Sequence, residues 1–376
     1  MCAGHLYGEF PEHDLAARLS HGDDRHPIFE RGGVRIAVIG QALPFTPIAN
    51  PRWMFPKWTF GIREKELQAE IDAVRANGAD LVVLLSHNGF NLDRKLATRV
   101  TGIDIIFAAH THDAMPSAFL VHEAKPAGTW IVASGCSGKF VSRIDLDVQG
   151  KKIKQISNRL IPVFSDAFKP DGEMAAEIAR QRAPFAKDLA RVLGTTHSLL
   201  YRRGTFNGPL DDVICDAILT QRDAEIALSP GVRWGTSLLP DQAITFEDLT
   251  NATAMSYPAC YRMGMTGARL KEILEDVADN AFNPDPYFQQ GGDMVRTGGL
   301  GYTIDVSKPM GQRISGLTHL KSGQPLDAAK NYTVAGWASV NEGTQGPPIW
   351  DVVAKHIETK KTVKAGDTGA VKVVGI

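Results

Sequence analysis

The periodicity of hydrophobic and polar residues differs between the first and later parts of this chain, and this difference predicts its architecture. Short and almost wholly apolar runs occupy 34–43, 81–85 and 103–109, which is typical of strands buried in a parallel sheet. Between these runs, the stretches 63–78 and 91–100 repeat apolar residues at helical spacing. The order of strand, helix, strand, helix, strand predicts an α/β unit.

The rhythm changes after this unit. A strand is predicted at 130–135, and 140–163 alternates apolar and polar residues around Gln149-Gly150, as an antiparallel hairpin or meander does. Residues 170–193 have helical spacing interrupted at Pro184, and we expect the domain boundary in this helical connector. The remainder mixes helices with strands, and its predicted helices are 209–219, 245–255 with a threonine N-cap, 267–281 and 349–361.

These patterns divide the chain into four parts. We expect an irregular leader at 1–33, an α/β domain at 34–165, a helical connector at 166–195 and an α+β domain at 196–376. The leader shows no clear periodicity and holds four of the eleven histidines. A second metal site is one interpretation of these four, and a segment without regular structure is the other; they are His5, His13, His21 and His26.

Composition excludes several classes of function. The net charge of −1 provides no basic field for nucleic acid or acidic lipid, and no apolar run reaches the length of a membrane span. The four cysteines lack metal-site spacing, and we expect buried free thiols rather than a disulfide framework. They are Cys2, Cys136, Cys215 and Cys260.

Histidines follow two of the predicted strands. His87 lies two residues after the strand at 81–85, in the sequence SHNG, and His110 and His112 follow the strand at 103–109 in the sequence HTHD. Ligands of open α/β sheets gather at the carboxyl ends of strands, so a site for Zn²⁺, Mn²⁺ or Fe²⁺ is the leading hypothesis. Hydrogen-bonded structural histidines, or one catalytic histidine supported by the others, are the alternatives. Asp113 either orients an imidazole or belongs to a surface turn.

Arginines lie on glycine-rich turns in the second half. Arg202 and Arg203 precede GTFNG, and Arg233 lies in SPGVRWG. Guanidinium groups in this setting capture oxyanions such as phosphate or sulfate, and a salt bridge to a nearby carboxylate is the alternative. The glycine-dense stretches 291–296 and 298–302 do not open a helix after a strand, so we interpret them as tight loops near a ligand or a neighbouring backbone.

The loop at 44–58 is unusually long, and it is rich in proline and aromatic residues. Long loops over a scaffold often belong to functional sites. A packed Ω-type loop is the alternative interpretation.

Several of these motifs resemble a known family. SHNG followed by HTHD resembles the last two metal-binding motifs of the dinuclear metallophosphoesterases of the 5′-nucleotidase group. The closer resemblance is to the SoxB thiosulfohydrolases, through IAVIGQALPFTPIANPRW, SHNGFNLDRKLA, AEIALSPGVRWGTSLLP, QQGGDMVRTGGLGYTID and VAGWASVNEGTQGPPIWDVV. The resemblance to this family extends from about Val34 to Val353. This resemblance implies an α/β fold in which a partial metallophosphoesterase αββα sandwich at 34–165 precedes a 5′-nucleotidase-type α+β domain.

The resemblance also implies an activity. His87 and His110 would ligate one metal and His112 the other metal of a manganese pair, which activates a water molecule. The implied reaction releases sulfate from a cysteine S-thiosulfonate on a SoxYZ-type carrier protein in the periplasm. Arg233 falls on the arginine of the family's substrate motif, and Arg202 and Asn207 fall near a second anion-binding stretch.

Two other functions stay open. The first is a 5′-nucleotidase or other phosphoesterase, although the stretches 256–259 and 336–339 differ from the aromatic clamp that nucleotidases place around the base. The second is a non-catalytic protein that binds an anion or a carrier. Neither nucleic acid nor a membrane is expected as a partner.

The sequence departs from the family pattern in its first part. It contains no Asp-x-His, no bridging aspartate of a Gly-Asp motif and no catalytic Asn-His pair in a strand-to-loop setting, and Ala109 stands where the family usually has glycine. We therefore expect a truncated chain with little turnover and at most one weakly held divalent metal. Absent strands would also leave an edge of the sheet uncovered. No export signal is visible.

Overall fold

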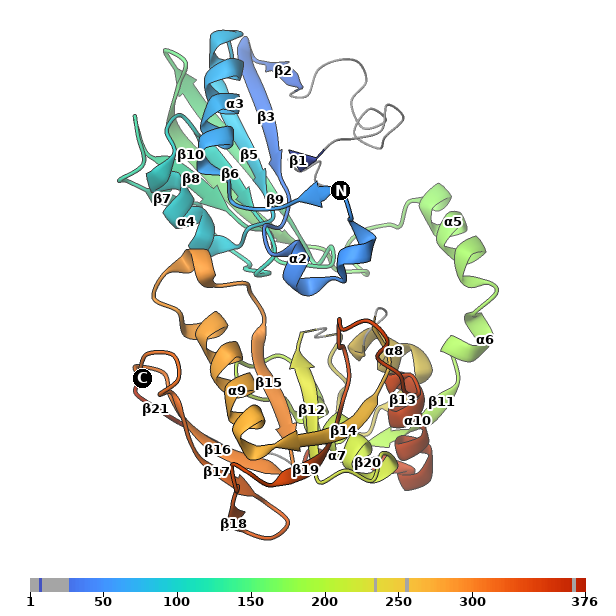
Figure 1. Ribbon diagram of the computed structural model, residues 1–376. Coiled ribbons are helices and arrows are strands. Elements are labelled where there is room, and N and C mark those ends of the chain that lie inside the picture. The colour runs from blue at the N-terminus through green and yellow to red at the C-terminus, as the bar shows by residue number, and fades with distance from the viewer. Residues whose placement is uncertain (1–6, 9–26, 233–234, 254–256, 367–369) are drawn as a thin grey trace. The chain divides into compact units, whose positions relative to one another are not determined.

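A computed structural model describes residues 7–8, 27–232, 235–253, 257–366 and 370–376 (Figure 1). The chain forms two compact units. The first comprises Met1–Pro170 together with Asp285–Tyr287, and the second comprises Asp171–Pro284 and Phe288–Ile376. The units divide between Pro170 and Asp171, within the stretch that the sequence analysis assigns to the connector.

The first unit is built on a six-stranded sheet with the order β2-β3-β5-β6-β8-β7. The four central strands are parallel, and the edge strands β2 and β7 are antiparallel to their neighbours. The predicted α/β order is thus confirmed. The strands are β2 (Ile28–Arg31), β3 (Val34–Gln41), β5 (Leu81–Ser86), β6 (Ile105–Ala108), β7 (Phe119–Val121) and β8 (Thr129–Val132).

Two helices, α3 (Glu64–Ala76) and α4 (Phe90–Arg99), pack on one face of this sheet. Their apolar residues share one core cluster with alternate residues of the central strands, because successive side chains of a strand point to opposite faces. The core includes Ile39, Leu67, Ile71, Val82, Leu84, Leu92, Leu96 and Ile106, each at most 2% exposed.

The end of α3 illustrates how local sequence sets these boundaries. Gly78 adopts a left-handed backbone with φ of 85°. Its amide donates to the carbonyl of Arg75 (2.9 Å), and the amide of Ala79 donates to the carbonyl of Val74 (3.0 Å). These are the two bonds of a Schellman motif, so the helical stretch predicted at 63–78 ends at its glycine.

The leader is not wholly irregular, which corrects the sequence-based expectation for its end. β2 (Ile28–Arg31) pairs with β3 across Gly32-Gly33, whose φ values are 55° and 74°. Two consecutive left-handed residues form a tight hairpin turn, which glycine adopts easily. The Gly-Gly dipeptide in the sequence could therefore have predicted this hairpin. β1 (Tyr7–Gly8) also pairs with β4 (Trp58–Thr59). His5, His13, His21 and His26 lie outside the described residues.

The predicted hairpin after the sheet is confirmed as β9 (Phe140–Gln149) and β10 (Lys152–Pro162), which form a separate two-stranded sheet. Its turn is Gly150-Lys151, with φ values of 57° and 62°, one residue later than expected. The Lys151 ammonium lies 2.8 Å from the Asp80 carboxylate, which ties the turn to the loop before β5.

The described residues of the second unit form three small sheets, ordered β13-β11-β20, β14-β19-β12-β15 and β18-β17-β16-β21. Its helices are α5 (Gly172–Arg182), α6 (Ala186–Leu189), α7 (Pro209–Gln221), α8 (Phe246–Ala252), α9 (Gly267–Phe282) and α10 (Ile349–Lys360). Its strands are β11 (Val192–Thr196), β12 (Ile226–Gly231), β13 (Ala243–Thr245), β14 (Tyr261–Thr266), β15 (Asp293–Gly298), β16 (Leu300–Asp305), β17 (Ile314–His319), β18 (Gln324–Pro325), β19 (Asn331–Gly336), β20 (Thr362–Val363) and β21 (Ala370–Val374).

Thr245 caps α8 as predicted, in a capping box with Asp248. The glycine-dense stretches are strands β15 and β16 rather than loops, joined at Gly299. A Cβ on Gly299 would overlap the carbonyl oxygen of Glu225, so this glycine serves a close approach of two backbones.

The described cysteines carry free thiols, as expected. Cys215 and Cys260 are buried, and burial raises the pKa of Cys260 to about 11, so this thiol stays protonated and unreactive near neutral pH. Within the described ranges, no helix has the length and apolar character that crossing a membrane requires.

Candidate functional site

The carboxyl ends of β5 and β6 bring two of the predicted histidines together. Ser86 and Ala108, the last residues of these strands, are register partners. His87 follows Ser86 directly, and His110 lies two residues beyond Ala108. Their half-buried rings have centroids 5.3 Å apart. The sheet therefore places both imidazoles at one edge, as the strand pattern predicted.

The surroundings of His87 favour its neutral form. Burial lowers the pKa of His87, and the neighbouring His110 and His112 lower it further by repulsion between positive charges. A neutral imidazole has a lone pair that can accept a proton or bind a metal ion. The influence of His112 also indicates that it lies near the pair.

The histidines do not complete a metal site by themselves. His110 and His112 have left-handed backbones with φ values of 75° and 61°, so the alternation of an extended strand does not govern where their side chains point. In the part of the chain that the structure describes, no three His, Cys, Asp or Glu side chains are grouped to hold a metal ion. A dinuclear centre needs bridging carboxylates, so the described residues do not fit one.

A buried polar network lies beneath His87. Asp93, on the first turn of α4, accepts hydrogen bonds from the Ser86 hydroxyl (2.7 Å) and the Asn88 amide (3.0 Å). The same amide donates to Gln41 Oε1 (2.8 Å), and the backbone amide of His87 donates to the Gln41 carbonyl (3.0 Å). The residues on both sides of His87 are therefore held by side chains that are almost fully buried.

The sequence analysis missed this network. Asp93 is 0% exposed, and burial raises its pKa to about 7 against the opposing effect of its two hydrogen bonds. Its only signal in the sequence is an aspartate next to Leu92 on the apolar face of a helix, directly after the histidine loop.

Thr111 holds the loop that carries the other two histidines. Its hydroxyl donates to Asp113 and accepts from the backbone amide of Phe90 (3.2 Å). Asp113 thus fixes the loop through Thr111, and this hydrogen bond links the HTHD loop to the start of α4.

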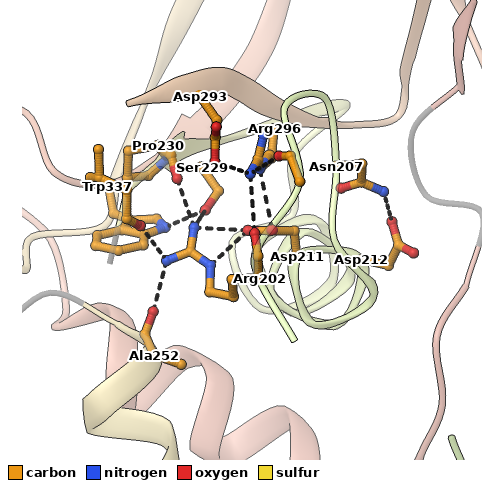
Figure 2. Close-up of polar contacts among 12 residues, drawn as sticks. Arg202, Asn207, Asp211, Asp212, Ser229, Pro230, Ala252, Asp293, Arg296 and Trp337 are labelled. Carbon is orange, nitrogen blue, oxygen red and sulfur yellow. Dashed lines mark hydrogen bonds and ion pairs between the residues drawn. The ribbon is translucent and has the colours of Figure 1, made fainter. Parts of the chain in front are cut away.

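The second unit buries a pair of arginines around one aspartate (Figure 2). Arg202 donates through Nε to Asp211 Oδ1 (2.8 Å). Its terminal nitrogens donate to the carbonyls of Val232 (2.8 Å), Ala252 (2.7 Å) and Pro230 (2.7 Å). The Ser229 hydroxyl accepts a longer bond (3.4 Å). Every nitrogen of this guanidinium therefore donates to a protein acceptor.

Arg296 completes the cluster from β15. Its Nε donates to Asp211 Oδ2 (3.2 Å), and its other nitrogens donate to carbonyls that include that of Gly204 (2.6 Å). Arg202 and Arg296 are 1% exposed, and Asp211 is 0% exposed. Burial raises the pKa of Asp211, and the two guanidinium charges oppose that rise. The cluster joins α7, β12 and β15 into one frame.

This geometry decides between the alternatives for Arg202. Its donors are engaged inside the protein, which favours the salt-bridge interpretation over direct substrate binding and corrects that expectation. Asn207 is exposed, and its amide donates to Asp212 (2.8 Å). Arg203 is exposed as well. Arg233 lies outside the described residues.

Each of the stretches 256–259 and 336–339, which were compared with the aromatic clamp of nucleotidases, contains one aromatic residue. Trp337 is 4% exposed, its indole N–H donates to Ser229 (3.0 Å), and the Arg202 guanidinium lies 5.5 Å from its ring centre (Figure 2). The Trp337 ring therefore contacts Arg202 inside the protein. Tyr257 is half-buried and has a left-handed backbone with φ of 54°.

Comparison with known proteins connects both units to solved folds. Residues 192–354 match the family model described as 5′-nucleotidase, C-terminal domain. The fold superposes on a sulfate thiohydrolase SoxB from Thermus thermophilus with a TM-score of 0.87 and 35% identity, covering 93% of this chain and 65% of that one. It also superposes on a 5′-nucleotidase precursor from Thermus thermophilus with a TM-score of 0.76 and 22% identity, covering 93% of this chain and 75% of that one.

Curated relatives agree. A snake venom 5′-nucleotidase from Naja atra is 23% identical, with 86% of this chain and 66% of the relative aligned. A 5′-nucleotidase from Rattus norvegicus is 21% identical, with 91% of this chain and 64% of the relative aligned. The chain thus spans slightly less than two thirds of these relatives. The mixed α/β fold with a 5′-nucleotidase-type C-terminal domain is confirmed.

Proposed function

We propose that the chain belongs to a hydrolase of the SoxB type, which releases sulfate from a cysteine S-thiosulfonate on a SoxYZ-type carrier protein. The observation that carries this proposal is the similarity to the Thermus thermophilus SoxB, at 35% identity over 93% of the chain. The 5′-nucleotidases reported above are 21–23% identical. The two histidines at the carboxyl ends of β5 and β6 support the proposal, because they place two imidazoles at the edge where such folds bind ligands.

The proposed reaction is a hydrolysis and needs no oxidant. The oxygen of a water molecule bonds to the terminal sulfonate sulfur, the bond between that sulfur and its neighbour breaks, and sulfate leaves. The carrier keeps the remaining sulfur as a cysteine persulfide, and the two protons of the water molecule go to the persulfide sulfur and to solvent.

We further propose that His87, His110 and His112 hold at most one divalent metal, and weakly. Three imidazoles suit a borderline cation such as Mn²⁺, which would supply a bound water of lowered pKa. Calorimetric titration with Mn²⁺ tests this, with the His110→Ala variant as control. Binding of equal strength in both proteins contradicts the assignment.

A phosphoester is the second candidate substrate. Residues 192–354 match the C-terminal domain of 5′-nucleotidases, which favours a nucleotide. Trp337 speaks against it, because its ring is buried beneath Arg202 and is not available to stack on a base. The third candidate is a non-catalytic protein that binds an anion or a carrier through its second unit.

One experiment separates the three candidates. A thiosulfonated carrier and AMP are incubated separately with the protein, and sulfate or phosphate is measured by ion chromatography. We expect slow sulfate release from the carrier, in keeping with the little turnover expected from the sequence, and loss of that release when His87, His110 and His112 are all changed to alanine. Phosphate from AMP alone supports the nucleotidase. Carrier binding that survives the triple change, with no product in either protein, supports the binding protein.

The resemblance also leads us to propose a periplasmic location. Fractionation of the producing cells tests it, and recovery of the protein with cytoplasmic markers contradicts it.

A further inference from the structure

The loop between β3 and α3 is closed at its base by the residue that supports His87. Gln41 is the last residue of β3, and its side-chain amide donates to the carbonyl of Ile62 (2.8 Å). This hydrogen bond holds the two ends of the loop 42–62 together. The carbonyl of the same glutamine accepts the His87 amide (3.0 Å), and its Oε1 accepts the Asn88 amide (2.8 Å). The loop therefore has its root at the histidine edge of the sheet.

The inside of this loop is packed and hydrogen-bonded. It contains the helical turns α2 (Thr46–Ala49) and η1 (Arg52–Met54). The Arg52 guanidinium donates to the carbonyls of Trp58 (2.8 Å) and Pro56 (3.0 Å). Phe55 is 5% exposed and meets the ring of Phe60 edge-on at 5.4 Å. These contacts give the loop a fixed shape, as an Ω-type loop has.

The outside of the loop exposes large apolar side chains. Ile48 is 55% exposed, Trp53 62% and Met54 49%, all within seven positions of the chain. We call these three residues the loop platform. Single exposed apolar residues are ordinary, but a cluster on a rigid support near a site is typical of a binding surface.

The charged residues of the loop's own segment have one sign. Residues 42–63 contain two arginines and one lysine and no Asp or Glu. Arg63 pairs with Glu66 (3.5 Å), whereas the hydrogen-bond acceptors of Arg52 are carbonyls, which leave its positive charge uncompensated. Lys57 is exposed, and no carboxylate among the described residues pairs with it. A loop that exposes apolar side chains and carries two such cations complements an apolar segment with negative charge.

We propose that the loop platform docks an extended, anionic polypeptide segment, namely the arm of the carrier that brings the substrate to the histidine edge. This inference rests on the proposed function, since it names the surface by which that substrate arrives. A second copy of this chain is a poorer occupant, because a symmetric contact through the platform would bring the Arg52 and Lys57 side chains of both copies, all positively charged, into one interface. Trp53 is the expected anchor, since tryptophan dominates the binding energy of such surfaces.

Binding can be measured without turnover. A fluorescently labelled peptide of roughly ten residues, apolar with three acidic side chains, is titrated with the protein and followed by anisotropy. The double variant Ile48→Ser, Trp53→Ser is compared with Phe168→Ser, a matched control because Phe168 is 48% exposed on a different segment. We expect Kd to rise roughly tenfold or more in the double variant and less than about twofold in the control. A peptide with lysines in place of the acidic residues should bind more weakly.

Several outcomes overturn the proposal. Equal losses in the double variant and the control, or equal binding of the acidic and basic peptides, refute a specific anionic docking surface. Binding of anionic lipid vesicles through the platform with none of the peptide makes the surface a membrane contact. A dimer in sedimentation that the double variant abolishes makes it a self-association surface. Absence of sulfate release with peptide binding intact refutes the proposed function alone.

Discussion

Replacing Asp93 with asparagine tests the buried network beneath His87. The carboxyl group is 0% exposed and accepts hydrogen bonds from Ser86 and Asn88 through one oxygen. Its other oxygen, and Oδ1 of Asn88, are buried with no hydrogen-bond partner among the described residues. Asparagine has the same shape but no charge, so the variant removes the titration and keeps the packing.

The sign of the effect follows from the pKa. Burial raises the pKa of Asp93 from 3.8 to about 7, so between these values the folded protein binds a proton that the unfolded chain releases. The contribution of this proton to stability is complete below pH 4 and is lost as pH rises toward 7. At about 1.4 kcal/mol per pKa unit the whole loss is about 4 kcal/mol, of which about 2–3 kcal/mol falls between pH 5 and pH 8.

Urea unfolding at pH 5, 6, 7 and 8 measures this loss in the wild type and in Asp93→Asn. Histidines titrate in the same range, but the difference between the two proteins cancels their effect. We expect the stability of the variant relative to the wild type to increase by about 2–3 kcal/mol from pH 5 to pH 8. A pH-independent difference would mean that Asp93 keeps an ordinary pKa, and the argument from burial would be wrong.

Three further predictions concern the stability of the second unit. Asp211→Asn leaves the buried Arg202 guanidinium without its counter-ion, and Arg296 with only Asp293, and should cost about 3–5 kcal/mol in urea unfolding, whereas Glu247→Gln, in an exposed pair, should cost less than about 1 kcal/mol. A hydrogen bond from a histidine of α10 and the neighbouring lysine lower the pKa of Asp216 to about 2. Its stabilisation should disappear as pH falls from about 4 to 2, and acid titration of Asp216→Asn should lack that step. Gly299→Ala should destabilise more than Gly323→Ala in thermal melts, because both have left-handed backbones but only the first would overlap a carbonyl.

The sequence alone determined the elements and the order in which they occur. Apolar runs without alternation marked β5 and β6, and helical spacing marked α3 and α4, because both rhythms reflect which face of an element is buried. The same patterns placed His87 and His110 at neighbouring strand ends, since parallel strands present their carboxyl ends at one edge of the sheet. The local signals of Gly78 and Thr245 set helix boundaries correctly, because capping depends on a few adjacent residues.

Only the tertiary structure decided what the polar residues do. Arg202 lies on a glycine-rich turn that suits anion binding, yet Asp211 and distant carbonyls take its donors. Asp93 looked like an ordinary helix residue, and its burial beside Ser86 and Asn88 makes it a titrating group. A guanidinium or carboxyl group can serve a ligand or the protein itself. Its spacing in the sequence does not distinguish these roles, because the partners that decide come from segments far apart in the chain.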